Sequence, residues 1–145
     1  MHDNITVLVI DDDVTIRTLL ESTLFRKGFN VLSAEGGTEG LEIAAREHVD
    51  VILLDWMMPE MDGMEVLAEL KRNSETMFIP VFMLTSKEDP KDIDLAISKG
   101  VVDYIIKPFN IYEVPEMVSN HIEKIHAGVS SGKEGFFHKL FSHKK

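Results

Sequence analysis

The 145-residue sequence contains no cysteine, which excludes a disulfide framework, a thiolate nucleophile and a cysteine-ligated zinc or iron–sulfur site. It also lacks an apolar run near the roughly 18 residues that a membrane-spanning helix needs. Its strongest runs, residues 5–10, 51–54 and 81–84, have the length of strands. Residues 1–4 hold no Lys or Arg and lead into a run that ends in three aspartates, a pattern that does not indicate a signal peptide. We therefore expect a single cytoplasmic domain with a hydrophobic core.

Positive charge is also scarce. The chain has 15 Lys and Arg against 25 Asp and Glu, which gives a net charge of -10. The deficit lies in residues 1–127, where 11 basic and 24 acidic residues give -13, whereas 4 Lys and 1 Glu give residues 128–145 a charge of +3. An acidic body repels the phosphates of DNA, and no segment the size of a helix-turn-helix follows it. The sequence therefore predicts no direct DNA binding.

Four apolar runs end in a polar residue, a pattern typical of strands buried on both faces of a parallel sheet. They are residues 7–10 before Asp11, 51–54 before Asp55, 81–84 before Thr85 and 104–106 before Lys107, with a weaker fifth run at Asn30–Ala34. Segments of helical length, with apolar residues spaced by about 3.6, alternate with these runs. Five strand–helix repeats predict an α/β fold with an open, doubly wound (βα)5 sheet.

Ligands of such sheets lie beyond the carboxyl ends of the strands. That rule brings Asp11, Asp12, Asp55, Thr85 and Lys107 to one edge. Clustered carboxylates repel one another and favour a hard cation such as Mg²⁺. A carboxylate can also attack phosphorus to give an aspartyl phosphate, and a hydroxyl and an ammonium can then bind phosphoryl oxygens. The edge is thus predicted to bind Mg²⁺ and a phosphoryl group.

Four segments, in order, resemble the response-regulator receiver domain of two-component signalling: VIDDD at 9–13, LDWMMPEMDG at 54–63, MLTS at 83–86 and YIIKPF at 104–109. The resemblance extends over about residues 5–127 and implies a flavodoxin-like sheet of strand order 2-1-3-4-5. It also implies a typically cis peptide bond before Pro108.

The resemblance assigns roles to the site residues. It implies that Asp55 is the phosphoacceptor and that Mg²⁺ is bound by Asp11, Asp12, Asp55 and the Met57 carbonyl. Thr85 resembles the switch hydroxyl, Lys107 the phosphate-contacting lysine and Tyr104 the aromatic switch. The side chains two positions after the phosphoacceptor and the switch hydroxyl, Met57 and Lys87, are expected over the approach of the hydrolysing water.

These features predict a stand-alone response regulator rather than an enzyme. It would take a phosphoryl group from a histidine kinase or phosphotransfer protein and contact a downstream partner through its fourth helix, fifth strand and fifth helix. Residues 128–135 have the composition of a flexible linker. The basic, Phe-rich residues after them are expected to contact a protein or an anionic membrane surface, to pack on the acidic body, or to stay disordered.

Two other functions remain open. Residues 9–15 also match the hhDxDxT motif of haloacid-dehalogenase-like phosphatases, with Asp11 as nucleophile, although Asp55 would then have no role. A receiver-like interaction module that works without phosphorylation is the second.

Two local features concern helix starts. Asp13 is expected to cap a helix that begins near Val14. Asn110 and Glu113 have the spacing of a helix cap, but Pro115 follows so closely that the last helix either starts at Pro115 or has a bent first turn.

Overall fold

A computed structural model describes residues 4–126 of the chain. The strands are β1 (Thr6–Ile10), β2 (Asn30–Ala34), β3 (Val51–Asp55), β4 (Val81–Thr85) and β5 (Asp103–Ile106). The helices are α1 (Val14–Arg26), α2 (Gly37–Arg46), α3 (Gly63–Arg72), α4 (Pro90–Ser98) and α5 (Val114–His126), with the 3₁₀ turn η1 (Ile111–Glu113) before α5. The predicted linker and tail, residues 128–145, lie outside the described residues.

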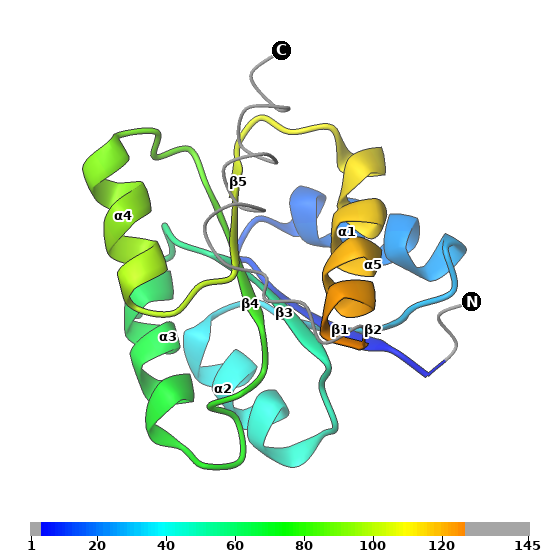
Figure 1. Cartoon of the computed structure of the whole chain (residues 1–145), viewed down its shortest axis with the longest axis horizontal. Coiled ribbons are helices and arrows are strands. Elements are labelled where there is room, and N and C mark those ends of the chain that lie inside the picture. Colours follow the sequence, from blue (N-terminus) through cyan, green and yellow to red (C-terminus); the bar gives the residue numbers. More distant parts are fainter. Residues whose placement is uncertain (1–3, 127–145) are drawn as a thin grey trace.

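The five strands form one parallel sheet of order β2-β1-β3-β4-β5, which confirms the predicted topology. Helices cover both faces of the sheet (Figure 1). On one face, α1 and α5 pack over a core that includes Leu24, Phe82 and Val118. On the other, α2, α3 and α4 pack over a second core that includes Leu54 and Leu67.

The strand sequences account for the positions of the strands in this sheet. Every residue of β3 and β4 is buried, as expected for interior strands whose side chains enter both cores in turn. The weaker run of β2 lies at an edge and keeps part of its surface exposed. The apolar runs therefore predict the number of strands, and the fully apolar runs of β3 and β4 are those of interior strands.

Side-chain caps define where α1 and α3 begin. The Asp13 carboxylate accepts hydrogen bonds from the backbone N–H groups of Thr15 and Ile16, which confirms the predicted cap of α1. At α3, Asp62 and Glu65 form a reciprocal capping box. Both caps lie in loops at the carboxyl edge of the sheet, so they fix the helices that flank the candidate site.

The start of the last helix settles a choice that the sequence left open. Asn110 caps η1 by accepting a hydrogen bond from the Tyr112 N–H at 3.0 Å, and α5 begins at Val114. Pro115 is the second helical residue, where its missing N–H removes no helical hydrogen bond. The α-helix therefore starts one residue before Pro115, and the turn that Asn110 caps before it is 3₁₀.

No helix in the described part of the chain is long and apolar enough to cross a membrane.

Gly63 is required by a close approach of the chain to itself. Its N–H donates to the Trp56 carbonyl at 2.8 Å, which folds the β3–α3 connection back against the end of β3. A Cβ on Gly63 would lie 2.5 Å from the Asp55 carbonyl oxygen and 2.8 Å from the Trp56 Cα. Both are backbone atoms of a buried segment, so a side chain at this position would displace the strand end that carries Asp55.

We therefore expect Gly63→Ala to lower the free energy of unfolding by about 1–3 kcal/mol, as overpacking usually does. Urea denaturation of the two proteins measures this change. Gly36→Ala is the control, because a Cβ there has no atom within 4 Å and the backbone is extended, so its loss reflects only the poorer helix capping by Ala. Equal losses in both variants would contradict a specific steric role for Gly63.

Candidate functional site

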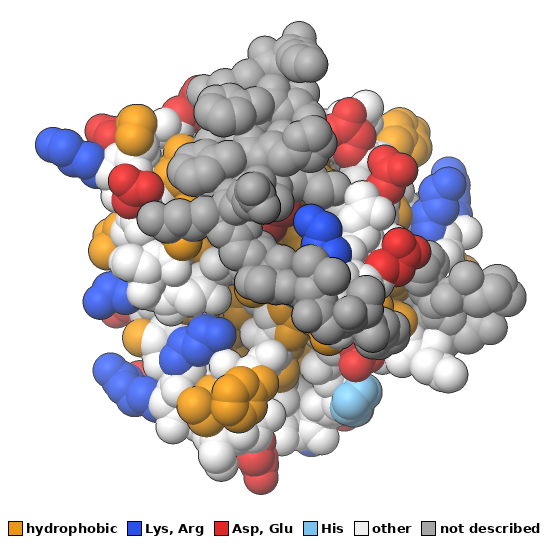
Figure 2. Space-filling model, in the orientation of Figure 1, with side chains coloured by type: hydrophobic (Ala, Val, Ile, Leu, Met, Phe, Trp, Pro, Cys, Tyr) orange, Lys and Arg blue, Asp and Glu red, His pale blue; other side chains and the backbone are white. Residues whose placement is uncertain are grey.

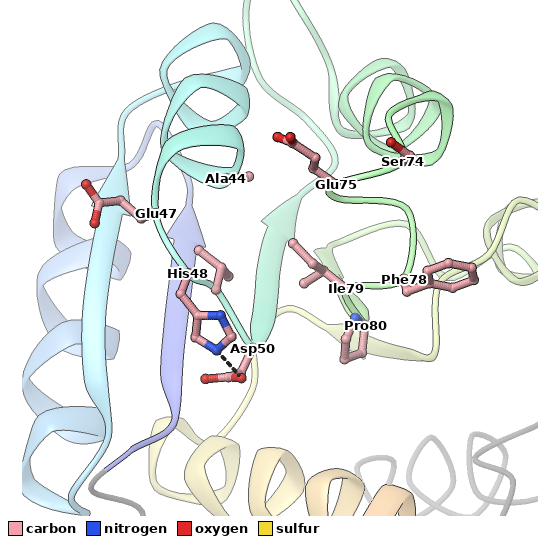
Figure 3. Close-up of a pocket in the computed structure, with 10 residues that line it drawn as sticks. Ala44, Glu47, His48, Asp50, Ser74, Glu75, Phe78, Ile79 and Pro80 are labelled. Atoms are coloured by element: carbon pink, nitrogen blue, oxygen red, sulfur yellow. Dashed lines mark hydrogen bonds and ion pairs between the residues drawn. The ribbon is translucent and has the colours of Figure 1, made fainter.

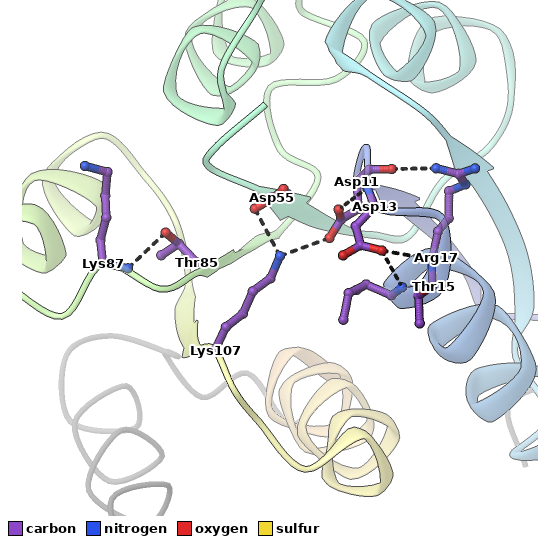
Figure 4. Close-up of polar contacts among 9 residues, drawn as sticks. Asp11, Asp13, Thr15, Arg17, Asp55, Thr85, Lys87 and Lys107 are labelled. Atoms are coloured by element: carbon purple, nitrogen blue, oxygen red, sulfur yellow. Dashed lines mark hydrogen bonds and ion pairs between the residues drawn. The ribbon is translucent and has the colours of Figure 1, made fainter. Parts of the chain in front are cut away.

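The candidate site lies at the carboxyl edge of the sheet, where the sequence predicted it. Asp55 and Thr85 are the last residues of β3 and β4, and Asp11 and Lys107 directly follow β1 and β5. Four strands thus each deliver one functional side chain to the same edge (Figure 4). The peptide bond between Lys107 and Pro108, at the end of β5, is cis, as the family resemblance implied.

Two buried carboxylates share one ammonium at the centre of the site. The Lys107 Nζ lies 3.3 Å from the Asp11 Oδ2 and 3.3 Å from the Asp55 Oδ1. Asp11 is fully buried and Asp55 is 3% exposed, so water screens their mutual repulsion weakly. One positive charge facing two negative charges leaves the site with a local excess of negative charge.

Asp11 is held by its surroundings as well as by Lys107. Its Oδ1 accepts a hydrogen bond from the Asp13 N–H at 2.8 Å, and its backbone carbonyl accepts one from the Arg17 Nη1 at 2.8 Å. This contact of Arg17 could not be predicted from the sequence. No motif signalled it, because the contact depends on how the first turn of α1 lies over the end of β1.

Asp12 completes a group that could hold a metal ion. A carboxylate oxygen from each of Asp11, Asp12 and Asp55 lies within 4.8 Å of the other two, and Asp12 faces solvent. Oxygen donors, two of them buried and undercompensated in charge, together with a side open to water, suit Mg²⁺, which keeps several water ligands. These residues therefore fit the cation that the sequence predicted, and the Met57 carbonyl as a fourth ligand stays a prediction.

The excess negative charge, together with burial, also shifts the pKa values of Asp55 and Lys107. Burial, reinforced by the charge of Asp11, raises the pKa of Asp55 from 3.8 to about 7, although Lys107 opposes the increase. Burial alone would lower the pKa of Lys107, but the charges of Asp11 and Asp55 outweigh it and raise that pKa. The site without a metal ion therefore binds protons where it could bind a divalent cation.

The two predicted switch residues, Thr85 and Tyr104, are fully buried and both contact the main chain of Lys87. The Thr85 Oγ accepts a hydrogen bond from the Lys87 N–H at 3.1 Å, and the Tyr104 hydroxyl donates to the Lys87 carbonyl at 3.0 Å. Burial raises the pKa of Tyr104 above its usual range, so its phenol stays protonated.

The Lys87 side chain points away from Asp55 (Figure 4), with its Nζ 5.2 Å from the centroid of the Trp56 ring. This differs from the position over the approach of the hydrolysing water that the family resemblance implied.

A hollow of about 350 Å³ lies at the opposite, amino edge of the sheet, between the end of α2 and the α3–β4 connection (Figure 3). His48 contacts the Asp50 Oδ1 at 2.9 Å, and the Asp50 Oδ2 accepts a hydrogen bond from the Thr6 N–H at 2.8 Å. Asp50 therefore ties β1 to the segment that precedes β3. None of the predicted site residues lines this hollow.

Comparisons with known proteins agree with the geometry. The family model described as "Response regulator receiver domain" matches residues 7–119. The chain is 40% identical over 111 residues to the alkaline phosphatase synthesis transcriptional regulatory protein PhoP of Bacillus subtilis, covering 77% of this chain and 45% of that protein. It is 39% identical over 119 residues to the probable transcriptional regulator ycf27 of Porphyridium aerugineum, covering 82% and 48%. The chain thus spans about half the length of these curated relatives.

Solved structures give the same result. The fold is similar to that of the chemotaxis protein CheY4 of Vibrio cholerae, with a TM-score of 0.76 and 31% identity, covering 80% of this chain and 97% of the other. It is also similar to the receiver domain of the Francisella response regulator 1452, with a TM-score of 0.78 and 30% identity, covering 84% and 99%.

The raised pKa of Asp55 predicts how stability depends on pH when a chelator removes divalent ions. Between about pH 4 and about pH 7 the folded protein keeps a proton on Asp55 that the unfolded chain releases, so wild-type stability should fall as the pH rises. Asp55→Asn removes this dependence. A tenfold difference in proton affinity corresponds to about 1.4 kcal/mol, and we expect the variant to gain more than about 1 kcal/mol over wild type across this range.

Urea unfolding of both proteins at a series of pH values measures the effect. Asp94→Asn, at an exposed position of α4, is the matched control, and it should track wild type. A constant difference between Asp55→Asn and wild type would contradict the raised pKa.

Proposed function

Because the chain belongs to the family of response regulator receiver domains, we propose that it accepts a phosphoryl group on Asp55 from a histidine kinase or a phosphotransfer protein. The observation that carries the proposal is the pairing of the Asp55 carboxylate with Lys107, beside Asp11, at the end of an interior strand. A nucleophile, a cation for the incoming phosphoryl oxygens and candidate metal ligands lie together there.

The proposed step is a displacement at phosphorus. A carboxylate oxygen of Asp55 forms a bond to phosphorus while the phosphorus–nitrogen bond of a phosphohistidine breaks, and the leaving imidazole takes up a proton. Mg²⁺ bound by Asp11, Asp12 and Asp55 would neutralise negative charge on the phosphoryl oxygens.

Two side chains of the site can bind the transferred group. Lys107 already lies within 3.3 Å of Asp55 and can pair with one phosphoryl oxygen. The Thr85 oxygen accepts a hydrogen bond from the Lys87 N–H, so its own hydrogen is available to donate to another phosphoryl oxygen. Phosphorylation would then draw the Thr85 hydroxyl toward Asp55. Thr85 and Tyr104 are both hydrogen-bonded to the main chain of Lys87, so the movement could reach Tyr104.

We propose that this change reaches a protein partner through the face formed by α4, β5 and α5. Tyr104 lies on β5, and two large hydrophobic residues, Leu95 on α4 and Tyr112 beside α5, are exposed. Direct DNA binding by this part of the chain is not proposed, because residues 1–127 carry a charge of -13. On the face that Figure 2 draws, both acidic and basic side chains are exposed.

The phosphoacceptor is tested by intact-mass analysis after incubation with acetyl phosphate and Mg²⁺. Wild type should gain one phosphoryl group that is labile to acid and base, because the product is an acyl phosphate. Asp55→Asn should gain none, and Thr85→Ala should be labelled more slowly. If Asp11→Asn abolished labelling while Asp55→Asn kept steady phosphatase turnover, the haloacid-dehalogenase-like function would replace this proposal.

A second prediction concerns how long the phosphoryl group persists. The Met57 side chain is 56% exposed and apolar, so it cannot orient the attacking water by hydrogen bonding. Asn at this position could do so, and one positioned contact of about 1.4 kcal/mol changes a rate about tenfold. We expect Met57→Asn to lose phosphate up to about tenfold faster in excess Mg²⁺ without kinase, with Met57→Leu as control. Equal lifetimes in all three proteins would exclude this role for residue 57.

For residues 128–145 we propose, from sequence alone, a surface-binding role. Their charge of +3 accompanies Phe136, Phe137 and Phe141. Deletion of these residues should leave labelling unchanged and weaken binding to vesicles that contain phosphatidylglycerol. The charge contribution should fade with added salt, since the Debye length is about 8 Å near physiological ionic strength. Unchanged vesicle binding after the deletion would remove this role.

A further inference from the structure

Lys87, in the β4–α4 connection, contacts three residues of the site through three different groups. Its N–H donates to the Thr85 Oγ at 3.1 Å, and its carbonyl accepts from the Tyr104 hydroxyl at 3.0 Å. Its ammonium lies 5.2 Å from the centroid of the Trp56 ring, within the range of a cation–π interaction. The main chain of one residue therefore holds both proposed switch side chains, and its side chain reaches the residue that follows Asp55.

Trp56 is itself held in place by burial and by two contacts. It is 6% exposed, and its backbone N–H donates to the Leu84 carbonyl at 3.0 Å. Its ring also meets the Tyr104 ring edge to face, with centroids 6.4 Å apart and planes at 81°. The Trp56 main chain is thus held by strand pairing and its indole by burial against the Tyr104 ring, so an ammonium over the indole is held relative to both.

The ammonium depends on the ring for its position. Within residues 4–126 it forms no ion pair, although Asp89 and other acidic residues follow it along the chain. The two backbone hydrogen bonds of Lys87 do not require a lysine, since any residue except proline at position 87 could donate and any could accept. The interaction at position 87 that does require a cation is the contact between the ammonium and the Trp56 ring.

We propose that Lys87 is a positioning residue: its ammonium, by lying over the Trp56 ring, keeps the β4–α4 connection closed so that the Thr85 hydroxyl and the buried Tyr104 ring stay in place for phosphoryl transfer to Asp55. The proposal rests on the proposed function of Asp55. It assigns to Lys87 an effect through Trp56, Thr85 and Tyr104 and no contact with the phosphoryl group.

Fluorine NMR of the unphosphorylated protein without Mg²⁺ tests the geometry directly. The chain has 1 Trp and 2 Tyr, so 5-fluorotryptophan gives a single resonance from Trp56, and 3-fluorotyrosine gives one from Tyr104 and one from the exposed Tyr112. Lys87→Met keeps the length of the side chain and loses its charge. We expect it to shift or broaden the Trp56 and Tyr104 resonances and to leave that of Tyr112 unchanged.

Two further variants separate the cation from other effects. Lys87→Arg keeps a cation that stacks on indole and should restore the wild-type spectrum. Lys91→Met makes the same charge change at an exposed position of α4 and should leave the spectrum unchanged. Labelling of Lys87→Met by acetyl phosphate should be slower by about two- to fivefold, the range that an exposed cation–π contact provides, and normal in Lys87→Arg.

Either of two results would overturn the proposal: a wild-type spectrum for Lys87→Met, or changes in Lys87→Arg as large as those in Lys87→Met. Because the spectra need no phosphorylation, they are independent of the function assigned to Asp55. Failure of wild type to be labelled would count against that function. Normal labelling of Lys87→Met despite altered spectra would contradict the positioning of Thr85 for transfer.

Discussion

Two buried carboxylates that share a single ammonium are the interaction on which the rest of the site depends. Asp11 and Asp55 each lie 3.3 Å from the Lys107 Nζ, and almost no water reaches either carboxylate. Burial raises the pKa of Asp55 to about 7, an increase that is reinforced by the uncompensated negative charge. This arrangement also makes the edge attractive to a divalent cation and places an ammonium where phosphoryl oxygens would arrive. A bound divalent cation would relieve this imbalance, and it would be needed still more once a phosphoryl group added further negative charge at Asp55.

The fold maintains this arrangement by burying the strands that carry it. β3 and β4 are buried along their whole length, so their ends cannot shift without disturbing both cores. Gly63 lets the chain fold back against the Asp55 and Trp56 backbone. Asp13 has two roles. Its side chain caps α1 and its N–H holds the Asp11 carboxylate, so the first helix and the first acidic residue are placed together.

The order of elements and the edge that carries the site could be predicted because both follow from backbone periodicity. Apolar runs mark strands, and polar residues at their ends meet at one edge of a parallel sheet. Contacts that depend on side-chain conformation could not be predicted in this way. The sequence shows Arg17 as an ordinary basic residue, and for Lys87 the family resemblance implied a different position, over the approach of the hydrolysing water. Their contacts with the Asp11 carbonyl and the Trp56 ring depend on how the chain turns after β1 and β4. The start of α5 was ambiguous for the same reason, since Pro115 suits either a first turn or a bend.

The central claim is that Asp55, and not Asp11 or Asp12, becomes the acyl phosphate. Reduction with borohydride tests it most directly, because borohydride converts an aspartyl phosphate into homoserine and leaves free aspartate unchanged. Protein treated with acetyl phosphate and Mg²⁺ would be reduced, digested and sequenced by tandem mass spectrometry. The account predicts homoserine at position 55 alone, and none in protein that received no phosphodonor. Homoserine at position 11 or 12, with aspartate intact at position 55, would contradict it.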